Sequence, residues 1–199
     1  VSSWSVFGQV VILLLIQIGG LGVVTIMSGL MILLHKKMGI NDRLLLQDAF
    51  NLNSLSGLVR FVKKVVIGTL VIEGIGALLY MTVFIPDFGQ KGIWISIFTS
   101  VSAFCNAGID IIAENSLCDY ALNPMVNTVT CFLIVIGGIG YIVWWDIIRV
   151  IKNIRQNKRK IFGNLTLHSK IAIISTLLLI IVGAILVFVL EYDNPQTLK

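Results

Sequence analysis

The residues best suited to chemistry in this chain are four small ones that follow a short polar stretch at 92–104: Cys105, Asn106, Ala107 and Gly108. An ion that leaves water must exchange its hydration shell for other oxygens, and backbone carbonyls supply these without adding a permanent charge. Carbonyls that line a lumen in successive layers need an extended backbone, with one position in a conformation that glycine tolerates best. Gly108 suits that position. We call residues 105–108 the filter segment. Their sequence predicts a path for a dehydrated cation that is lined by backbone carbonyls.

A second candidate is Glu73, an ionisable residue inside the apolar stretch 65–85. Such a group is costly within a membrane and usually faces protein or water. One reading is a polar anchor, hydrogen-bonded to backbone amides of the polar helix or to a basic group elsewhere in the protein. The other reading is a cation site. We favour the anchor, because selective potassium paths generally use carbonyls rather than a fixed carboxylate.

These residues need elements that position them, and composition indicates a membrane as their setting. The 199 residues are 57% hydrophobic and 13% charged, with a mean hydropathy of +0.96. Soluble domains are about 45–50% apolar and about 25% charged. A helix needs about 20 apolar residues to span a bilayer. We predict an all-α integral membrane protein with four such stretches, at 6–34, 65–85, 125–145 and 171–190.

The basic residues predict which ends of these stretches face the cytoplasm. All Lys and Arg except Lys91 and Lys199 fall within 36–64 or 149–170. Positive residues near spans mark the cytoplasmic side. Both blocks of basic residues face the cytoplasm only if the stretch at 92–109, which lies between them in the sequence, does not cross the membrane. A helix over 92–104 would be about 20 Å long at about 1.5 Å per residue, too short for about 30 Å of hydrocarbon. We predict a re-entrant helix that enters and leaves from outside.

The composition of this re-entrant helix supports burial within protein. Its polar residues suit a segment surrounded by other helices better than one in lipid: Ser96, Thr99, Ser100 and Ser102. A helix lying flat at the interface would carry basic residues along one face, and only Lys91 is available. Four acidic residues are predicted outside: Asp87, Asp110, Glu114 and Asp119. They form either a vestibule that concentrates cations or an ordinary solvated loop, and both readings stay open.

The chain contains an internal repeat. Gly19, Gly20 and Gly22 in the first stretch recur as Gly137, Gly138 and Gly140 in the third. We favour helix packing as their role, since small residues let membrane helices approach closely, with a gating hinge as the alternative. The repeat divides the chain into an incoming helix with its cytoplasmic linker at 1–59, a complete helix–pore-loop–helix unit at 60–150, and a linker with the first helix of a next unit at 151–199.

Cysteine and histidine placement argues against an enzyme. The three cysteines are an odd number without metal-ligand spacing, which excludes a disulfide framework and a zinc site. His35 and His168 border the cytoplasmic loops, so neither can act as a base for Cys105 on the outer side. We expect no catalytic residues and no cofactor. The only metal we expect is the transported ion.

Four motifs together resemble the membrane subunit of the Trk/Ktr potassium transporter superfamily: Gln17-Ile18-Gly19-Gly20-Leu21-Gly22, Ile72-Glu73-Gly74-Ile75-Gly76-Ala77-Leu78, Ser102-Ala103-Phe104-Cys105-Asn106-Ala107-Gly108 and Ile136-Gly137-Gly138-Ile139-Gly140. The resemblance implies four helix–pore–helix units around one ion path, with 105–108 as the filter of the second unit. Ile109 stands where an aromatic residue is expected. The resemblance also implies that the remaining filters lie before Val1 and beyond Lys199.

The resemblance implies partners as well. They are a cytoplasmic nucleotide-binding regulatory ring, the rest of the same polypeptide and surrounding lipid, and we also expect a homodimer and no nucleic acid. The loop 38–57 is either a docking face for the regulatory ring or an amphipathic helix at the inner surface. We expect potassium transport across the plasma membrane by a multi-pass protein, with coupling to Na⁺ or H⁺ left open. The alternative is a non-conducting assembly subunit.

Overall fold

The computed structural model describes residues 4–22, 58–112, 116–153 and 161–192, and within them it contains helices, turns and connecting segments but no strand. The chain divides into two compact units, Val1–Gly138 and Ile139–Lys199. The described helices of the first unit are α1 (Val6–Leu21), α4 (Leu58–Phe88), α5 (Lys91–Phe104), the short 3₁₀ helix η2 (Cys118–Tyr120) and α6 (Pro124–Ile139). The second unit contains α7 (Tyr141–Asn153), η3 (Ile161–Asn164) and α8 (Leu167–Glu191).

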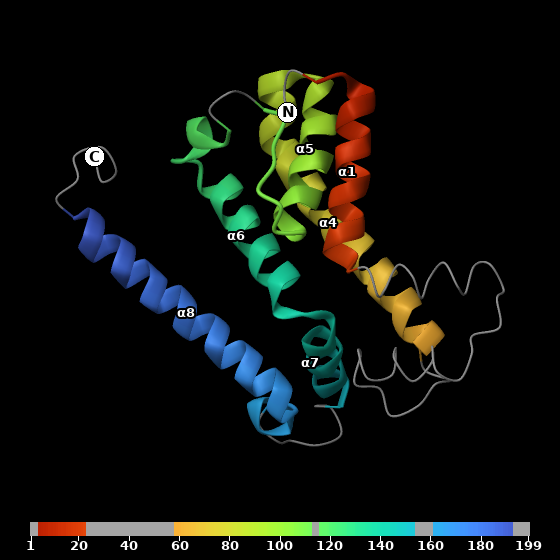
Figure 1. The fold of residues 1–199 in the computed structure, drawn as a ribbon, viewed down its shortest axis with the longest axis vertical. Coiled ribbons are helices and arrows are strands. Elements are labelled where there is room, and N and C mark those ends of the chain that lie inside the picture. Colours follow the sequence, from red (N-terminus) through yellow and green to blue (C-terminus); the bar gives the residue numbers. More distant parts are fainter. Residues whose placement is uncertain (1–3, 23–57, 113–115, 154–160, 193–199) are drawn as a thin grey trace. The chain divides into compact units, whose positions relative to one another are not determined.

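The first unit is built around α5. Figure 1 shows that α5 begins where α4 ends and runs back along it, and that the chain then returns toward the end at which α5 began. Helix α1 also packs on α5 and α4. The chain thus runs from the long helix α4 through the short helix α5 and its following loop to α6, and the assignment of this order to a pore-loop unit stays a prediction.

The core of this unit is aromatic and aliphatic. Tyr80 stacks on Phe84 with ring centroids 5.5 Å apart, and Tyr120 meets Phe84 edge to face at 5.1 Å. Phe98 and Phe104 of α5 are at most 2% exposed. Tyr80 also forms a hydrogen bond of 2.6 Å with Thr130, which joins α4 to α6. These residues form the core of the unit, because buried aromatic side chains contribute large apolar areas, and α5 packs mainly on α4.

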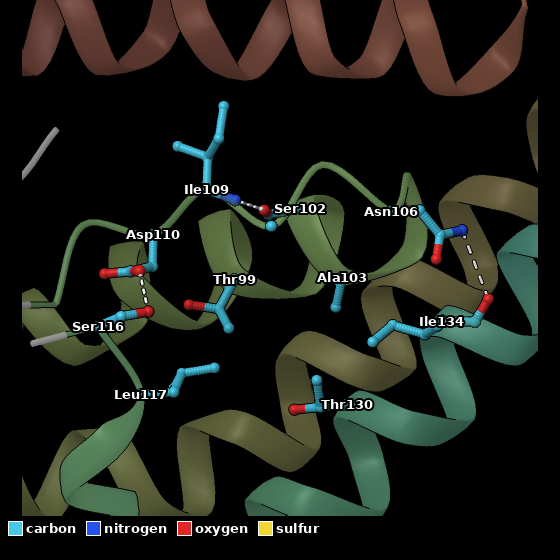
Figure 2. A pocket seen from close by; sticks show the side chains of 11 residues that line it. Thr99, Ser102, Ala103, Asn106, Ile109, Asp110, Ser116, Leu117, Thr130 and Ile134 are labelled. Atoms are coloured by element: carbon cyan, nitrogen blue, oxygen red, sulfur yellow. Dashed lines mark hydrogen bonds between the residues drawn. The ribbon is translucent and has the colours of Figure 1, made fainter. Parts of the chain in front are cut away.

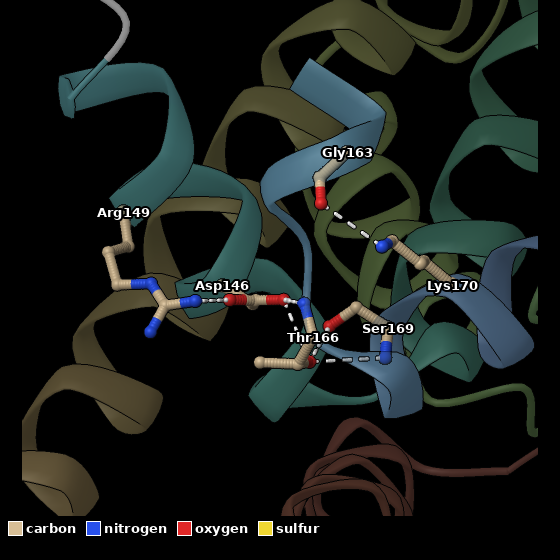
Figure 3. Close-up of polar contacts among 6 residues, drawn as sticks. All are labelled: Asp146, Arg149, Gly163, Thr166, Ser169 and Lys170. Carbon is tan, nitrogen blue, oxygen red and sulfur yellow. Dashed lines mark hydrogen bonds and ion pairs between the residues drawn. The ribbon is translucent and has the colours of Figure 1, made fainter. Parts of the chain in front are cut away.

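The second unit is held by a buried carboxylate. Asp146 of α7 is 6% exposed and accepts hydrogen bonds from the backbone N–H of Thr166 at 2.8 Å and from its hydroxyl at 2.9 Å. It also pairs with Arg149. Thr166 is the N-cap of α8, and its hydroxyl accepts the N–H of Ser169 (Figure 3). A carboxylate suits this end of a helix, where unpaired N–H groups point outward. Asp146 therefore links α7 to the start of α8.

Two described helices are long and apolar enough to cross a membrane, Val62–Phe88 and Leu167–Glu191, and a third span results if α6 and α7 count as one broken span. The stretches predicted at 65–85 and 171–190 lie within α4 and α8. Apolar side chains of α8 such as Leu179 and Val187 are more than half exposed. Lipid or further protein is the environment that such a surface requires.

One predicted span is wrong as a continuous helix. The stretch 125–145 is interrupted at Gly140, which has a φ of 92° and separates α6 from α7. A residue with a side chain rarely adopts this conformation, whereas glycine does so without steric cost. For the predicted stretch 6–34, α1 ends at Leu21, where the N–H of Gly22 bonds to the carbonyl of Gly19. The remainder of that stretch, the loop 38–57 and His35 lie outside the described residues.

Candidate functional site

The polar side chains of helix α5 are buried in the protein interior. Ser96, Thr99, Ser100 and Ser102 are each at most 3% exposed. Ser100 donates to the backbone carbonyl of Glu73 at 2.7 Å and thereby ties α5 to α4. The hydroxyl groups that lipid could not accommodate are thus surrounded by other helices. The 14-residue length of α5 is also close to the predicted 92–104.

The filter segment follows α5 directly, and two of its residues have left-handed backbone conformations. Asn106 has a φ of 55° and Gly108 a φ of 65°. Ser102 forms hydrogen bonds with residues on both sides of Gly108. Its carbonyl accepts the N–H of Ala107 at 2.9 Å, and its hydroxyl accepts the N–H of Ile109 at 2.9 Å. Asparagine is the residue that tolerates this conformation best after glycine. The segment is therefore tied to the end of α5 at two points.

The N–H groups and the carbonyl groups of this segment differ in their partners among the described residues. The N–H groups of Cys105, Asn106 and Ala107 are all bonded to carbonyls of α5. The carbonyl oxygens of residues 105–108, in contrast, accept no hydrogen bond from any residue that the structure describes. Backbone carbonyls that lack a protein donor need water or a cation as a partner. The described residues thus supply no hydrogen-bond donor to these four oxygens.

Two of the predicted glycines lie directly against the start of the filter segment. A Cβ atom on Gly20 of α1 would overlap the thiol of Cys105, and a Cβ on Gly137 of α6 would overlap the carbonyl oxygen of Phe104. A Cβ on Gly138 would make an ordinary contact at 3.7 Å with Asn106 Nδ2, and one on Gly19, Gly22 or Gly140 would meet no atom within 4 Å. In each glycine motif, therefore, only one of the three glycines, Gly20 or Gly137, lies where an added side chain would overlap the residues at the start of the filter segment.

Glu73 of α4 lies close to Cys105, the first residue of the filter segment. It is 5% exposed, and Gln17 Nε2 donates to its two carboxylate oxygens at 3.0 and 3.1 Å. The thiol of Cys105 lies 3.9 Å from Oε1. These partners differ from the backbone amides and the basic group expected from the sequence, because α1 passes close to α4 at this level. Glu73 therefore connects α1, α4 and the first residue of the filter segment.

A cavity of about 250 Å³, lined by both apolar and polar side chains, lies beside the filter segment between α5 and α6. Figure 2 shows the side chains that line it, including Thr99 of α5 and Thr130 of α6. Asn106 donates to the carbonyl of Ile134 at 3.4 Å along the same wall. Gly108 belongs to the lining as well, so the cavity adjoins the filter segment itself.

The predicted outer acidic residues have local partners. Asp110 accepts the N–H of Ile112 at 3.1 Å and is hydrogen-bonded to the hydroxyl of Ser116. Tyr120 donates to Asp87 at 2.7 Å. Burial, this hydrogen bond and the charges of Asp87 and Asp119 raise the pKa of Tyr120 to about 12, so it remains a protonated donor. Glu114 lies outside the described residues.

Two residues of the site are not identified from the sequence. The role of Ser102 depends on a bond to a residue seven positions later, which no periodic pattern predicts. Gln17 is part of the first glycine motif, and a glutamine in a largely apolar helix is itself a signal for a buried polar partner. No group of three or more His, Cys, Asp or Glu side chains that could hold a metal occurs among the described residues.

Comparison with known proteins decides the family. The model of the TrkH family, described as cation transport proteins, matches residues 1–193. The chain belongs to the TrkH family. The predicted resemblance is therefore confirmed, and a TrkH protein with helices apolar enough to cross a bilayer is a membrane protein.

Several curated proteins are similar to the chain in sequence. The chain is 38% identical over 198 residues to the Ktr system potassium uptake protein B of Bacillus subtilis, covering 99% of the chain and 42% of that protein. It is 41% identical over 197 residues to the potassium/sodium uptake protein NtpJ of Enterococcus hirae, with 98% and 42% covered. It is 33% identical to the Ktr system potassium uptake protein B of Vibrio alginolyticus, with 96% and 40% covered. The chain thus spans about two fifths of the length of these relatives.

Proposed function

We propose that the whole protein carries potassium across the plasma membrane and that residues 105–108 supply part of its selectivity filter through their backbone carbonyls. The observation that carries this proposal is the set of four carbonyl oxygens that accept no hydrogen bond from the described residues, next to N–H groups that are bonded to α5. A dehydrated cation requires such a layer of oxygens. Three relatives have potassium uptake in their names, which supports K⁺ as the ion.

The surroundings of the filter segment support the same proposal. Helix α5 ends at Phe104, so the partial negative charge of its C-terminal end lies beside the segment and favours a cation. Gly20 and Gly137 allow two helices to approach the start of the segment closely. Glu73 acts here as a polar anchor, because its carboxylate oxygens are engaged by Gln17. A filter needs such rigid support to hold its oxygens at fixed spacing.

The arrangement of the whole protein is part of the proposal. We expect four helix–pore-loop–helix units, with 60–150 as one complete unit, 1–59 ending the preceding unit and 151–199 beginning the next. The protein would be multi-pass, would form a homodimer and would work with a cytoplasmic nucleotide-binding partner. The word "system" in the names of two relatives supports the existence of further components. Coupling to Na⁺ or H⁺ and the absence of enzymatic activity and cofactors are likewise expectations for the complete protein.

The test is uptake by the full-length protein in bacteria that lack other potassium uptake systems. Expression should restore growth at low potassium and support ⁸⁶Rb⁺ uptake that K⁺ inhibits more strongly than Na⁺. Gly108→Ser should abolish the preference for K⁺, because a serine strains the left-handed position at a φ of 65°. Gly163→Ser, at a glycine with open space around it, is the matched control. Unchanged flux and selectivity in Gly108→Ser would refute the filter, and absence of any flux in the full-length protein would favour an assembly subunit.

A further inference from the structure

The cavity between α5 and α6 contains a buried hydroxyl group that lacks a partner among the described residues. Thr99 is 3% exposed, and its Oγ1 forms no hydrogen bond within the part of the chain that the structure describes. In Figure 2 this oxygen points to the side on which Asp110 and Ser116 lie. Buried polar groups in native proteins are paired almost without exception, so an unpaired one calls for a ligand or water. Thr99 therefore marks a position where the cavity binds something.

The charge of the cavity indicates what kind of ligand this is. Asp110 is the one charged residue among the described residues of the lining. Each of its carboxylate oxygens accepts one hydrogen bond, from Ile112 N–H and from Ser116. A carboxylate has about four lone-pair sites, so acceptor capacity remains. An anionic wall with additional hydroxyl oxygens favours a cation over an anion or an apolar molecule.

The other hydroxyl groups of the lining are already engaged. Thr130 donates to the carbonyl of Val126 at 2.7 Å and is bonded to Tyr80, and Ser102 accepts the N–H of Ile109. Ser116 donates to Asp110 but still has its acceptor lone pairs, so Thr99 and Ser116 are the hydroxyls whose oxygens can face a ligand beside Asp110. A volume of about 250 Å³ exceeds the roughly 30 Å³ that one water occupies in the liquid. An ion that keeps part of its hydration shell fits this space.

We infer that this cavity is a second cation site, which holds a partly hydrated potassium ion beside the outer end of the filter segment through Thr99, Asp110 and Ser116. The identity of the ion rests on the proposed function. The site shares Asn106 and Gly108 with the filter segment. An ion held there raises the occupancy of the filter entrance at low external potassium. The site therefore lowers the potassium concentration needed for half-maximal uptake.

The test uses ⁸⁶Rb⁺ uptake by the full-length protein, with KM and maximal rate measured separately. Thr99→Val is isosteric and removes the hydroxyl, so KM should rise roughly three- to tenfold, as expected for loss of one polar contact to an ion. Thr99→Ser should restore a KM near that of the wild type. Asp110→Asn should also raise KM. Thr128→Val, on the same α6 that lines the cavity but outside its lining, should leave KM unchanged.

Wild-type KM values in both Thr99→Val and Asp110→Asn would overturn the inference and assign the cavity to water alone. If Thr99→Val fails to reach the membrane, Asp110→Asn decides by the same criterion. The two proposals fail differently. A Gly108→Ser protein with unaltered flux and selectivity refutes the filter, whereas a loss of selectivity in Gly108→Ser with unaltered KM in both cavity variants refutes only the second site.

Discussion

The hydroxyl oxygen of Ser102 accepts the backbone N–H of Ile109 at 2.9 Å. Because the carbonyl of Ser102 also accepts the N–H of Ala107, one residue at the end of α5 holds the filter segment on both sides of Gly108. Ser102 is buried, so removal of its hydroxyl would leave a donor unpaired with little access to water. The geometry of the filter segment thus depends on a side chain of the helix that precedes it.

Ser102→Ala should reduce the preference for K⁺ over Na⁺ while leaving the protein folded. The lost hydrogen bond costs about 1–3 kcal/mol when the remaining donor stays unpaired, and the strain falls on the positions that set carbonyl spacing. Ser102→Thr keeps the hydroxyl and should retain more of the selectivity. Inhibition of ⁸⁶Rb⁺ uptake by Na⁺ measures the effect. An alanine variant as selective as the wild type would show that this bond does not support the filter.

Gly137→Ala should destabilise the protein, whereas Gly138→Ala should be tolerated. The two glycines are neighbours in α6, and alanine improves helix propensity equally at both. Only at Gly137 would the added methyl group overlap a backbone atom, the carbonyl oxygen of Phe104. Overpacking of this kind costs about 1–3 kcal/mol. Thermal stability of the purified full-length protein in detergent distinguishes the two, and equal stability would contradict the packing role of Gly137.

Glu73→Gln should fold and keep the ion preference of the wild type. The amide oxygen of the new side chain can still accept from Gln17, so the link between α4 and α1 survives the loss of charge. Glu73→Ala removes the acceptor and should lower stability by about 1–3 kcal/mol, since Gln17 then loses its partner. Thermal unfolding and ⁸⁶Rb⁺ against ²²Na⁺ uptake are the measurements. A changed ion preference in Glu73→Gln would make Glu73 a cation site rather than an anchor.

Asp146→Ala should destabilise the protein more than Arg149→Ala. The Arg149 side chain is 57% exposed and that of Asp146 4%. An ion pair with one exposed partner contributes about 0–1 kcal/mol. Loss of Asp146 also removes the two bonds to Thr166 that link α7 to the start of α8. Thermal stability of the two variants, measured side by side, checks the order. A larger loss in Arg149→Ala would mean that the ion pair dominates.

The sequence predicts α4, α5 and α8 well because their signals are local. A short stretch with Ser96, Thr99 and Ser100 among apolar residues indicates a helix buried by other helices, and α5 has that burial. Long runs of Ile, Leu and Val at 65–85 and 171–190 define α4 and α8. The bend at Gly140 is less visible, since the residues on both sides are equally apolar and hydropathy does not distinguish one helix from two.

The site is less predictable because its contacts join distant positions. The sequence shows the small residues of the filter segment and the polar Glu73 in an apolar stretch, but it does not predict which residues they contact. Gln17 reaches Glu73 across 56 positions, and the approach of Gly137 to Phe104 depends on how α6 packs against α5. The cavity at Thr99 is likewise formed by three separate segments. Such features follow from tertiary packing rather than from periodicity or composition.

The most direct test of the filter is the position of an ion in crystals of the full-length protein grown with Rb⁺ or Tl⁺. Anomalous scattering locates these potassium analogues independently of the protein atoms. The proposed function predicts a strong peak within coordination distance of the carbonyl oxygens of residues 105–108. Peaks confined to the Glu73 carboxylate, or a filter segment without any peak in crystals that contain the ion elsewhere along the pathway, would contradict it.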